Sequence, residues 1–365
     1  TTTPRPAEDS SLARWWRPVC LCCAVALLVA TPLTPTERTG LTGNALPYVM
    51  LWLLLTLIWF AGTALLRVPL AKLDGIDALA AALAGWHVIS GLVMMYHGAP
   101  RWTINALWTW VSFAVIVILL RQLVRGHLEA KALCAVMIAL AVCLSVLAFH
   151  QALVTLPQAR AMYERDPEEA LQDAGNLHAP EGSAIRKQFE SRLYSSEPTA
   201  TFSLTNSLAG YLAPWLVFLI GITATKLVSR EPTARADSTT LWIGLLVSML
   251  LLAICLLLTK SRTAWLATFV GIAVVAGVLL WQHGRRRLML LLGSQLVIMA
   301  ALVTVLGLFN ALPQRLVSAA MLSLKYRFEY WRSTLAMIRD YPLFGCGPGN
   351  YQSYYTTYKL PQASE

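Results

Sequence analysis

The chain has 365 residues, of which 57% are hydrophobic and 13% are charged, and its formal net charge at pH 7 is +10. Soluble globular proteins carry about 25% charged residues, so this composition excludes an ordinary soluble protein and indicates a polytopic membrane protein. The positive charge does not indicate nucleic-acid binding, because basic residues of membrane proteins collect on the cytoplasmic loops that orient the helices. We therefore expect no nucleic-acid partner.

Nine apolar runs approach the length of about 20 residues that a helix needs to span a bilayer. They cover residues 16–33, 46–66, 76–96, 103–120, 132–153, 204–224, 239–258, 264–282 and 288–309. The first run is flanked by Arg14 and Arg17 and has no clear small-residue cleavage site, so we interpret it as a retained helix. The expected fold is all-α: one polytopic membrane domain over residues 1–365 with about nine transmembrane helices.

Basic residues divide unevenly between the two sets of short loops. With a cytoplasmic N-terminus, fourteen basic residues lie on the cytoplasmic side and four lie on the external side. This bias follows the positive-inside rule and predicts a multi-pass protein with its N-terminus in the cytoplasm. The cytoplasmic residues are Arg5, Arg14, Arg17, Arg67, Lys72, Arg121, Arg125, Lys131, Lys226, Arg230, Arg235, Arg285, Arg286 and Arg287, and the external ones are Arg38, Arg101, Lys260 and Arg262.

Two segments, 154–203 and 310–365, are too long and too polar to be simple connectors. The topology places both outside, where we interpret them as a first periplasmic loop and the start of a large periplasmic loop. In the first, Ile185, Phe189 and Leu193 recur every four residues and predict an amphipathic helix that could lie against the membrane surface.

The second long segment begins with a predicted helix, one face of which carries Phe328, Trp331, Leu335 and Ile338. Pro342 is expected to end this helix. The stretch "YPLFGCGPGNY" follows at residues 341–351. Gly345, Gly347 and Gly349 can adopt backbone angles that other residues avoid. We expect a rigid turn, with Asn350 near its tip, that folds the external loop back over the membrane site. The alternative is a simple structural turn without any ligand contact, which would still position the segment that follows.

The stretch "TKSRTAWL" joins two long apolar runs with hardly any loop, so Lys260 and Arg262 lie at the outer edge of the bilayer. Ser261 and the neighbouring amides could help Arg262 to hold an oxyanion, because free N–H groups and a guanidinium group both favour phosphate. Two further candidates are Arg192, at the end of the amphipathic helix, and Asn206, one turn into the sixth apolar run. The alternatives are interfacial anchors for Lys260 and Arg262, a solvated charge for Arg192 and a helix-end polar residue for Asn206.

The seven cysteines show no disulfide framework and no Cys/His spacing typical of a metal site. Six lie inside apolar runs, where they behave as small hydrophobic residues, and Cys346 lies in a polar loop. We expect no metal and no cofactor.

The motifs resemble those of the O-antigen ligase and O-antigen polymerase superfamily, in an ordered set from about residue 130 onward. "SRTAWL" at 261–266 resembles its Arg-x-x-x-Leu signature, with Arg262 and Leu266 in those positions, and "ATFSLTNSLAGYL" at 200–212 resembles its entry into a central helix. "RFEYWRSTLAMIRDYPLFGCGPGNY" at 327–351 is similar to its periplasmic stretch, an Arg/Trp helix followed by a Gly-Pro-Gly turn.

The resemblance implies a glycosyltransferase at the periplasmic face of the bacterial inner membrane. Such an enzyme takes a glycan from an undecaprenyl-diphosphate carrier, and Arg192 and Arg262 would hold the diphosphate without a metal ion. An O-antigen ligase would use lipid A–core as the acceptor; a polymerase would use another repeat unit, and an oligosaccharyltransferase a protein. Membrane lipids are the remaining expected partner.

The family usually carries a His-Asn pair, whose histidine is the expected general base, a short distance beyond the position of Glu365. The catalytic base is therefore unassigned, and we expect the chain to be truncated at its C-terminus. From another class of protein, a transporter of inorganic carbon or another anion stays possible. A transporter should place ionisable residues deep within its helices, and the apolar runs are nearly free of them, which favours the enzyme.

Overall fold

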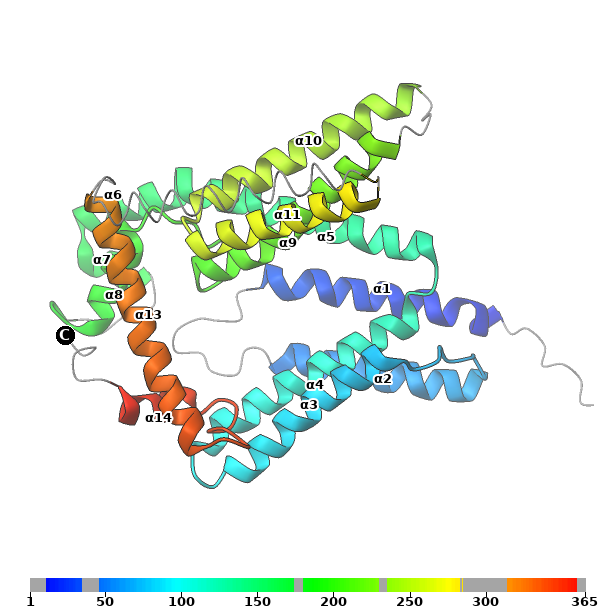
Figure 1. Cartoon of the computed structure of the whole chain (residues 1–365), viewed down its shortest axis with the longest axis horizontal. Coiled ribbons are helices and arrows are strands. Elements are labelled where there is room, and N and C mark those ends of the chain that lie inside the picture. The colour runs from blue at the N-terminus through cyan, green and yellow to red at the C-terminus, as the bar shows by residue number, and fades with distance from the viewer. Residues whose placement is uncertain are drawn as a thin grey trace, which may run out of the picture. The chain divides into compact units, whose positions relative to one another are not determined.

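The computed structural model describes residues 11–34, 46–173, 180–229, 235–282, 284 and 314–359, and the regular elements in these ranges are helices (Figure 1). Their bounds are α1 Ser11–Leu33, α2 Leu46–Leu66, α3 Gly75–Met94, α4 Pro100–Leu123, α5 His127–His150, η1 Gln151–Thr155, α6 Leu156–Arg165, α7 Pro167–Asp173, α8 Ala184–Tyr194, α9 Thr205–Ser229, α10 Arg235–Leu258, α11 Arg262–Gln282, α13 Gln314–Asp340 and α14 Tyr351–Tyr358.

Eight helices in the described ranges are long and apolar enough to cross a membrane, so the expected all-α polytopic fold is confirmed. They correspond to the first eight apolar runs, and the predicted ninth run, 288–309, lies outside the described residues. The fifth helix is longer than expected: the chain continues through the π-helical turn η1 into α6 and stays helical from His127 to Arg165. The predicted helix after residue 183 is confirmed as α8.

The chain forms two compact units. The described residues of the first unit are 11–28, 46–130 and 314–359, and thus most of α1 together with α2, α3, α4, α13 and α14. The described residues of the second unit are 29–34, 131–173, 180–229, 235–282 and 284, and thus most of α5 together with η1 and α6 to α11.

In the first unit, the segments predicted to be cytoplasmic meet at one end of the helices. Arg17 of α1 donates to the Leu123 carbonyl at 2.8 Å and forms an ion pair of 2.7 Å with Glu129. Arg121, near the end of α4, pairs with Asp77 at 2.8 Å and also bonds Asp74. These contacts bring together the N-terminal region, the α2–α3 connection and the α4–α5 connection, as the charge pattern requires.

Asp74 is the N-cap of α3, and its side chain accepts from the backbone N–H groups of Ile76 and Asp77. These amides, Ile76 first, and the nearby Arg121 guanidinium group keep the pKa of the Asp74 carboxyl below its ordinary value. The same carboxylate therefore caps α3 and ties it to the end of α4.

In the second unit, α9 lies against α10 and α11 around a buried aliphatic core. Leu208, Leu212 and Leu219 of α9 are fully or almost fully buried, as are Leu144 of α5 and Leu252 of α10. A side chain at Gly271 of α11 would meet Val217 of α9 at 2.9 Å, so the glycine permits the close approach of these two helices.

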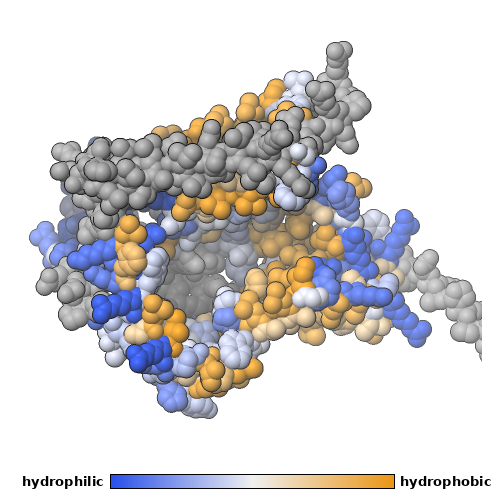
Figure 2. Space-filling model, in the orientation of Figure 1, coloured by the Kyte–Doolittle hydropathy of each residue, from blue (hydrophilic) through white to orange (hydrophobic). Residues whose placement is uncertain are grey.

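Large apolar side chains cover the outside of the spanning helices. In the first unit, Figure 2 shows them gathered over α3 and α4, where Leu79, Trp86 and Leu92 are 49% to 69% exposed. Leu246 of α10 is 67% exposed. Contiguous exposed apolar surface of this kind requires an apolar surrounding, which a bilayer provides.

Candidate functional site

The turn between α10 and α11 holds three of the predicted binding residues. Lys260 has a φ of +52°, a backbone conformation that side chains with a Cβ rarely adopt. Buried Thr259 and Ser261 flank it; the Thr259 hydroxyl donates to the Leu256 carbonyl at 2.7 Å. Arg262 is exposed and opens α11. The buried hydroxyls hold the turn, and the two cations point outward from it.

The structure brings this turn to the segment that follows α8. The Lys260 Nζ donates a hydrogen bond of 2.6 Å to the Ser196 hydroxyl. Ser196 lies four residues beyond Arg192. The Arg192 side chain is exposed, and neither it nor Arg262 forms an ion pair within the described part of the chain. Lys260 thus links the segment that carries Arg262 to the segment that carries Arg192, and both guanidinium groups remain accessible.

Two side chains position the segment from Arg192 onward. Arg160 of α6 donates to the Leu193 carbonyl at 2.7 Å and to the Ser195 carbonyl at 3.1 Å, at the C-terminal end of α8. The Gln151 side-chain oxygen accepts from the backbone N–H groups of Thr199 and Ala200, each at 2.8 Å. The Arg160 bonds satisfy carbonyl groups that the end of α8 leaves free, and the Gln151 bonds hold the backbone between α8 and α9.

Backbone strain is concentrated at the same place. Among the described residues other than glycine, Arg67, Ala200 and Lys260 have positive φ, and the last two belong to this site. Such conformations are unfavourable and persist only where surrounding contacts enforce them, which is common at functional sites. At this site the enforcing contacts are those of Gln151 and Ser196.

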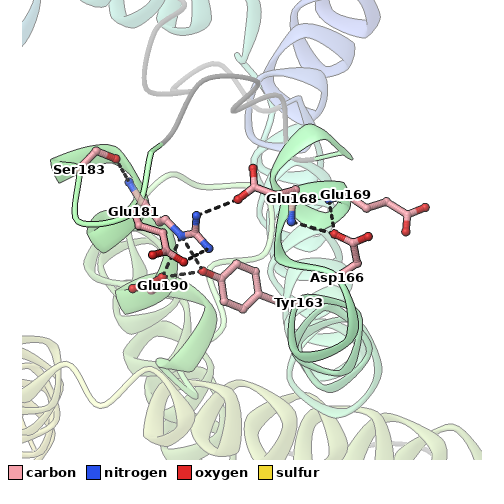
Figure 3. A network of polar contacts seen from close by, with 8 residues as sticks. Tyr163, Asp166, Glu168, Glu169, Glu181, Ser183 and Glu190 are labelled. Atoms are coloured by element: carbon pink, nitrogen blue, oxygen red, sulfur yellow. Dashed lines mark hydrogen bonds and ion pairs between the residues drawn. The ribbon is translucent and has the colours of Figure 1, made fainter.

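A buried arginine fixes α8 to α6 and α7. Arg186 is 6% exposed; it donates to the Tyr163 hydroxyl at 3.2 Å and pairs with Glu168 at 2.9 Å. Figure 3 shows Tyr163, Glu168 and Glu190 converging from three helices, with the Tyr163 hydroxyl donating to Glu190 at 2.5 Å. The Tyr163 hydroxyl and then the Glu168 carboxylate raise the pKa of Arg186, which therefore stays charged.

Most of the apolar face of α8 packs against α6 and α7. Leu193 is buried and Phe189 is half-buried, and both pack against Tyr163 of α6 and Leu171 of α7. The expectation that this face could lie on the membrane is wrong for these two residues, because the interior of the unit already covers them. Ile185 remains exposed.

An apolar groove with a volume of about 990 Å³ runs along α9 and α11. At one end it is lined by Gly210 and Ala264, two residues beyond Arg262, and at the other end by Lys226 and Gln282. Between them it is lined mainly by glycine, alanine, valine and other apolar residues. The groove therefore offers an apolar path along the spanning helices that begins beside the cationic turn.

The glycine turn lies in the first unit, against the α3–α4 connection. Asn350 is fully buried there; its side-chain oxygen accepts from the Ala99 N–H at 3.0 Å, and its side-chain nitrogen donates to the Thr103 hydroxyl at 2.9 Å. Gly349 has a φ of +83°, and a side chain at this position would meet the Trp102 carbonyl at 2.5 Å. Asn350 thus lies inside the contact rather than at an exposed tip.

Further contacts seat the same turn on α3. The Ser90 hydroxyl donates to the Phe344 carbonyl at 2.5 Å, and the Phe344 ring stacks on Trp86 with 5.7 Å between centroids. Gly345 and Gly347 also have positive φ, and a side chain at Gly347 would meet the Met94 side chain at 2.8 Å. The α3–α4 connection is external in the predicted topology, and so is the glycine turn, so the contact agrees with the prediction that both lie on one face.

Asn206 lies in the first turn of α9 and is exposed. No hydrogen bond between its side chain and another described residue places it at the cationic turn, so its role remains a prediction. The described residues contain no group of three or more His, Cys, Asp or Glu side chains arranged to hold a metal ion.

The sequence alone did not indicate three residues of this site: Arg160, Gln151 and Ser196. Arg160 lies in a short polar helix beside other charged residues, and Gln151 lies near the end of the apolar run 132–153, so neither stands out in the sequence. The partners of Arg160 and Gln151 are backbone groups 33 to 49 residues away, and the partner of Ser196 is the Lys260 side chain, so only the fold reveals these contacts.

We predict that Arg160→Met loosens the segment that carries Arg192. The substitution keeps an apolar stem but removes two hydrogen bonds from a charged donor, each of which contributes about 1.5–3 kcal/mol. Backbone amides of residues 193–200 should then exchange hydrogen faster, as measured by mass spectrometry on the detergent-solubilised protein. The control is Arg165→Met, an exposed arginine of the same helix; equal exchange in both variants would contradict the positioning role.

The fold and the site define a class: an all-helical, multi-pass membrane protein with a cationic turn at one end of its spanning helices. Among known protein families, the one described as O-Antigen ligase has a model that matches residues 247–365. This part of the chain, which includes the cationic turn and the glycine turn, is similar to that family, and the match supports the resemblance noted in the sequence. The family indicates a glycosyltransferase-like membrane enzyme that acts on glycans and lipid-linked substrates. No curated protein and no solved structure matches the chain.

Proposed function

We propose that the protein transfers a glycan from an undecaprenyl-diphosphate carrier to an acceptor hydroxyl, in the manner of an O-antigen ligase. The observation that carries the proposal is the Lys260–Ser196 contact, which joins the segments bearing Arg262 and Arg192. The reaction forms a bond between the acceptor oxygen and the anomeric carbon and breaks the bond from that carbon to the diphosphate. The electron pair of the broken bond leaves with the diphosphate, and fixed cations stabilise that developing charge.

The apolar groove along α9 and α11 supports a lipid-linked donor. A polyisoprenoid chain needs an apolar environment next to the site that holds its diphosphate, and the groove ends two residues from Arg262. We propose that the lipid tail occupies this groove while Arg192, Lys260 and Arg262 hold the diphosphate. The acceptor proton passes to a general base, for which none of the residues described here is assigned.

A transporter finds less support. The buried charged side chains among the described residues are Asp77 and Arg186; both lie near the starts of helices and both are paired. An ion pathway instead calls for ionisable groups near the bilayer midplane. We further propose that the protein resides in the bacterial inner membrane, with its N-terminus in the cytoplasm and the site at the periplasmic face.

The test is an assay of the purified full-length protein with a fluorescent undecaprenyl-diphosphate glycan. Three acceptors are offered separately: lipid A–core, a second lipid-linked repeat unit and a serine-containing protein. Transfer to lipid A–core is the expected result. Transfer only to a repeat unit or only to protein would replace the ligase by a polymerase or an oligosaccharyltransferase. Neither binding nor consumption of the donor with any acceptor would refute the proposal.

A further inference from the structure

Helix α13 has two faces, and the described part of the chain covers one of them in part, since Tyr330 on that face is still 43% exposed. This face packs against α14. The centroids of the Tyr330 and Tyr355 rings lie 4.5 Å apart, and the Thr334 and Tyr351 hydroxyl oxygens lie 2.7 Å apart. Ser333, on the same side, is 3% exposed. The opposite face needs a separate explanation.

Five large apolar residues form a continuous stripe on the uncovered face, and each is 44% to 65% exposed. Their spacing of four, three, four and three residues keeps them on one side of a helix. We call them the α13 stripe; they are Leu324, Phe328, Trp331, Leu335 and Ile338. The Phe328 and Trp331 rings pack edge to face with 5.5 Å between their centroids, so the stripe is a continuous apolar surface.

Arginines border the α13 stripe on both sides. At about 100° per residue, Arg327 lies on one side of the stripe, and Arg332 and Arg339 lie on the other. All three are exposed, and none forms an ion pair with another described residue. The acidic Glu329 and Asp340 lie on the opposite half of the helix. An apolar stripe bordered by arginines is typical of a helix that lies in the plane of a membrane interface.

The contacts of the glycine turn place the C-terminal end of α13 at the boundary of the bilayer. The helix ends at Asp340, and the residues that follow at once form the glycine turn, which is seated on the α3–α4 connection. Because α3 and α4 have membrane-spanning length, their connection marks the boundary of the bilayer. Within this unit, α13 runs across the direction of α3 and α4 rather than alongside them (Figure 1). A helix with that direction at that boundary lies along the membrane surface.

We propose that α13 is an interfacial helix that binds the lipid surface. The α13 stripe enters the boundary between headgroups and acyl chains, and Arg327, Arg332 and Arg339 bind lipid phosphates. Figure 2 shows apolar and hydrophilic side chains next to each other along α13, as this arrangement requires. Three of the five stripe residues are aliphatic and offer no hydrogen bond to a sugar, which favours a lipid partner over a glycan. The inference does not depend on the proposed reaction.

The test places a fluorescent amino acid at a single position of the full chain in lipid nanodiscs. The two positions are Leu335, on the stripe, and Ala336, its exposed neighbour, which is rotated by about 100°. Quenching is measured with phospholipids brominated in the acyl chain and, separately, with aqueous iodide. We expect brominated lipid to quench the probe at Leu335 severalfold more than the probe at Ala336, and iodide to show the opposite order. A probe at Leu246 of α10 is the positive control for lipid contact.

Three results would overturn the proposal. Equal quenching at both positions would mean that α13 has no preferred side toward lipid. Protection of Leu335 from both quenchers would mean that protein covers the stripe. Quenching by iodide alone, relieved by added soluble glycan, would assign the stripe to carbohydrate. Phe328 and Lys325 form a second matched pair for the case in which a probe at Leu335 prevents folding.

Discussion

Replacement of Arg262 by alanine is expected to lower kcat/KM for the lipid-linked donor by about 100- to 1,000-fold, the effect of removing one fixed group that stabilises transition-state charge. Arg262 is exposed at the first position of α11 and has no ion-pair partner among the described residues, so its charge is available to a ligand. Arg262→Lys keeps the charge but loses the planar donor fork, and should recover only part of the activity. Donor consumption by the purified protein is the measurement.

The matched control is Lys131→Ala, which removes an exposed cation from α5 in the same unit, far along the chain from the cationic turn. It should leave donor consumption unchanged. If both alanine variants consume the donor at the wild-type rate, Arg262 does not hold the diphosphate. If both lose activity equally, the effect reflects a general loss of charge. Elution of each variant as a single species in size-exclusion chromatography separates a lost contact from misfolding.

Asn350→Ala is expected to detach the glycine turn from the α3–α4 connection. The fully buried Asn350 side chain bonds the Ala99 amide, the Thr103 hydroxyl and the Cys346 carbonyl, the last at 3.2 Å. Each buried polar group left without a partner costs about 1–3 kcal/mol. The variant should therefore unfold at a lower temperature in detergent, and a protease should cleave between residues 341 and 351 under conditions that leave the wild type intact.

Gln352→Ala is the control for this substitution, because Gln352 is exposed one residue into α14. It should keep the wild-type protease resistance. A third variant, Gly98→Ala, attacks the same contact from the other side: its new methyl group would meet the Asn350 side chain at 2.5 Å. Full protease resistance of both Asn350→Ala and Gly98→Ala would show that other contacts, such as the Ser90 bond, suffice to hold the turn.

The spanning helices could be predicted because the bilayer imposes a length and a polarity that each run satisfies by itself. The start of α8 and the end of α13 were also predictable, since a serine cap and a proline act on neighbouring residues. The burial of Arg186 could not be predicted from its own helix. Its partners Tyr163 and Glu168 come from α6 and α7, so the charge looked solvated in the sequence.

The candidate site was predictable only in part, for the same reason. Lys260 and Arg262 stood out because cations are rare between two apolar runs, whereas Ser196 is one of many serines in a polar loop. The contact between Lys260 and Ser196 depends on the strained turn at Lys260 and on how α9 packs against α11. Asn350 was noticed as part of a glycine-rich turn, but its burial depends on Gly98 and Thr103, far away in the sequence.

The seat of the glycine turn also has a consequence for biogenesis. The bond from Ala99 to Asn350 joins residues 251 positions apart, and that from Ser90 to Phe344 joins residues 254 positions apart. A ribosome therefore delivers α3 and α4 to the membrane long before it makes the residues that complete their external end. Until then the Ala99 amide and the Thr103 hydroxyl lack their final partner. A chain released before Asn350 is expected to retain this incomplete end and to be degraded by membrane quality-control proteases. The C-terminal part would therefore protect the N-terminal helices from degradation.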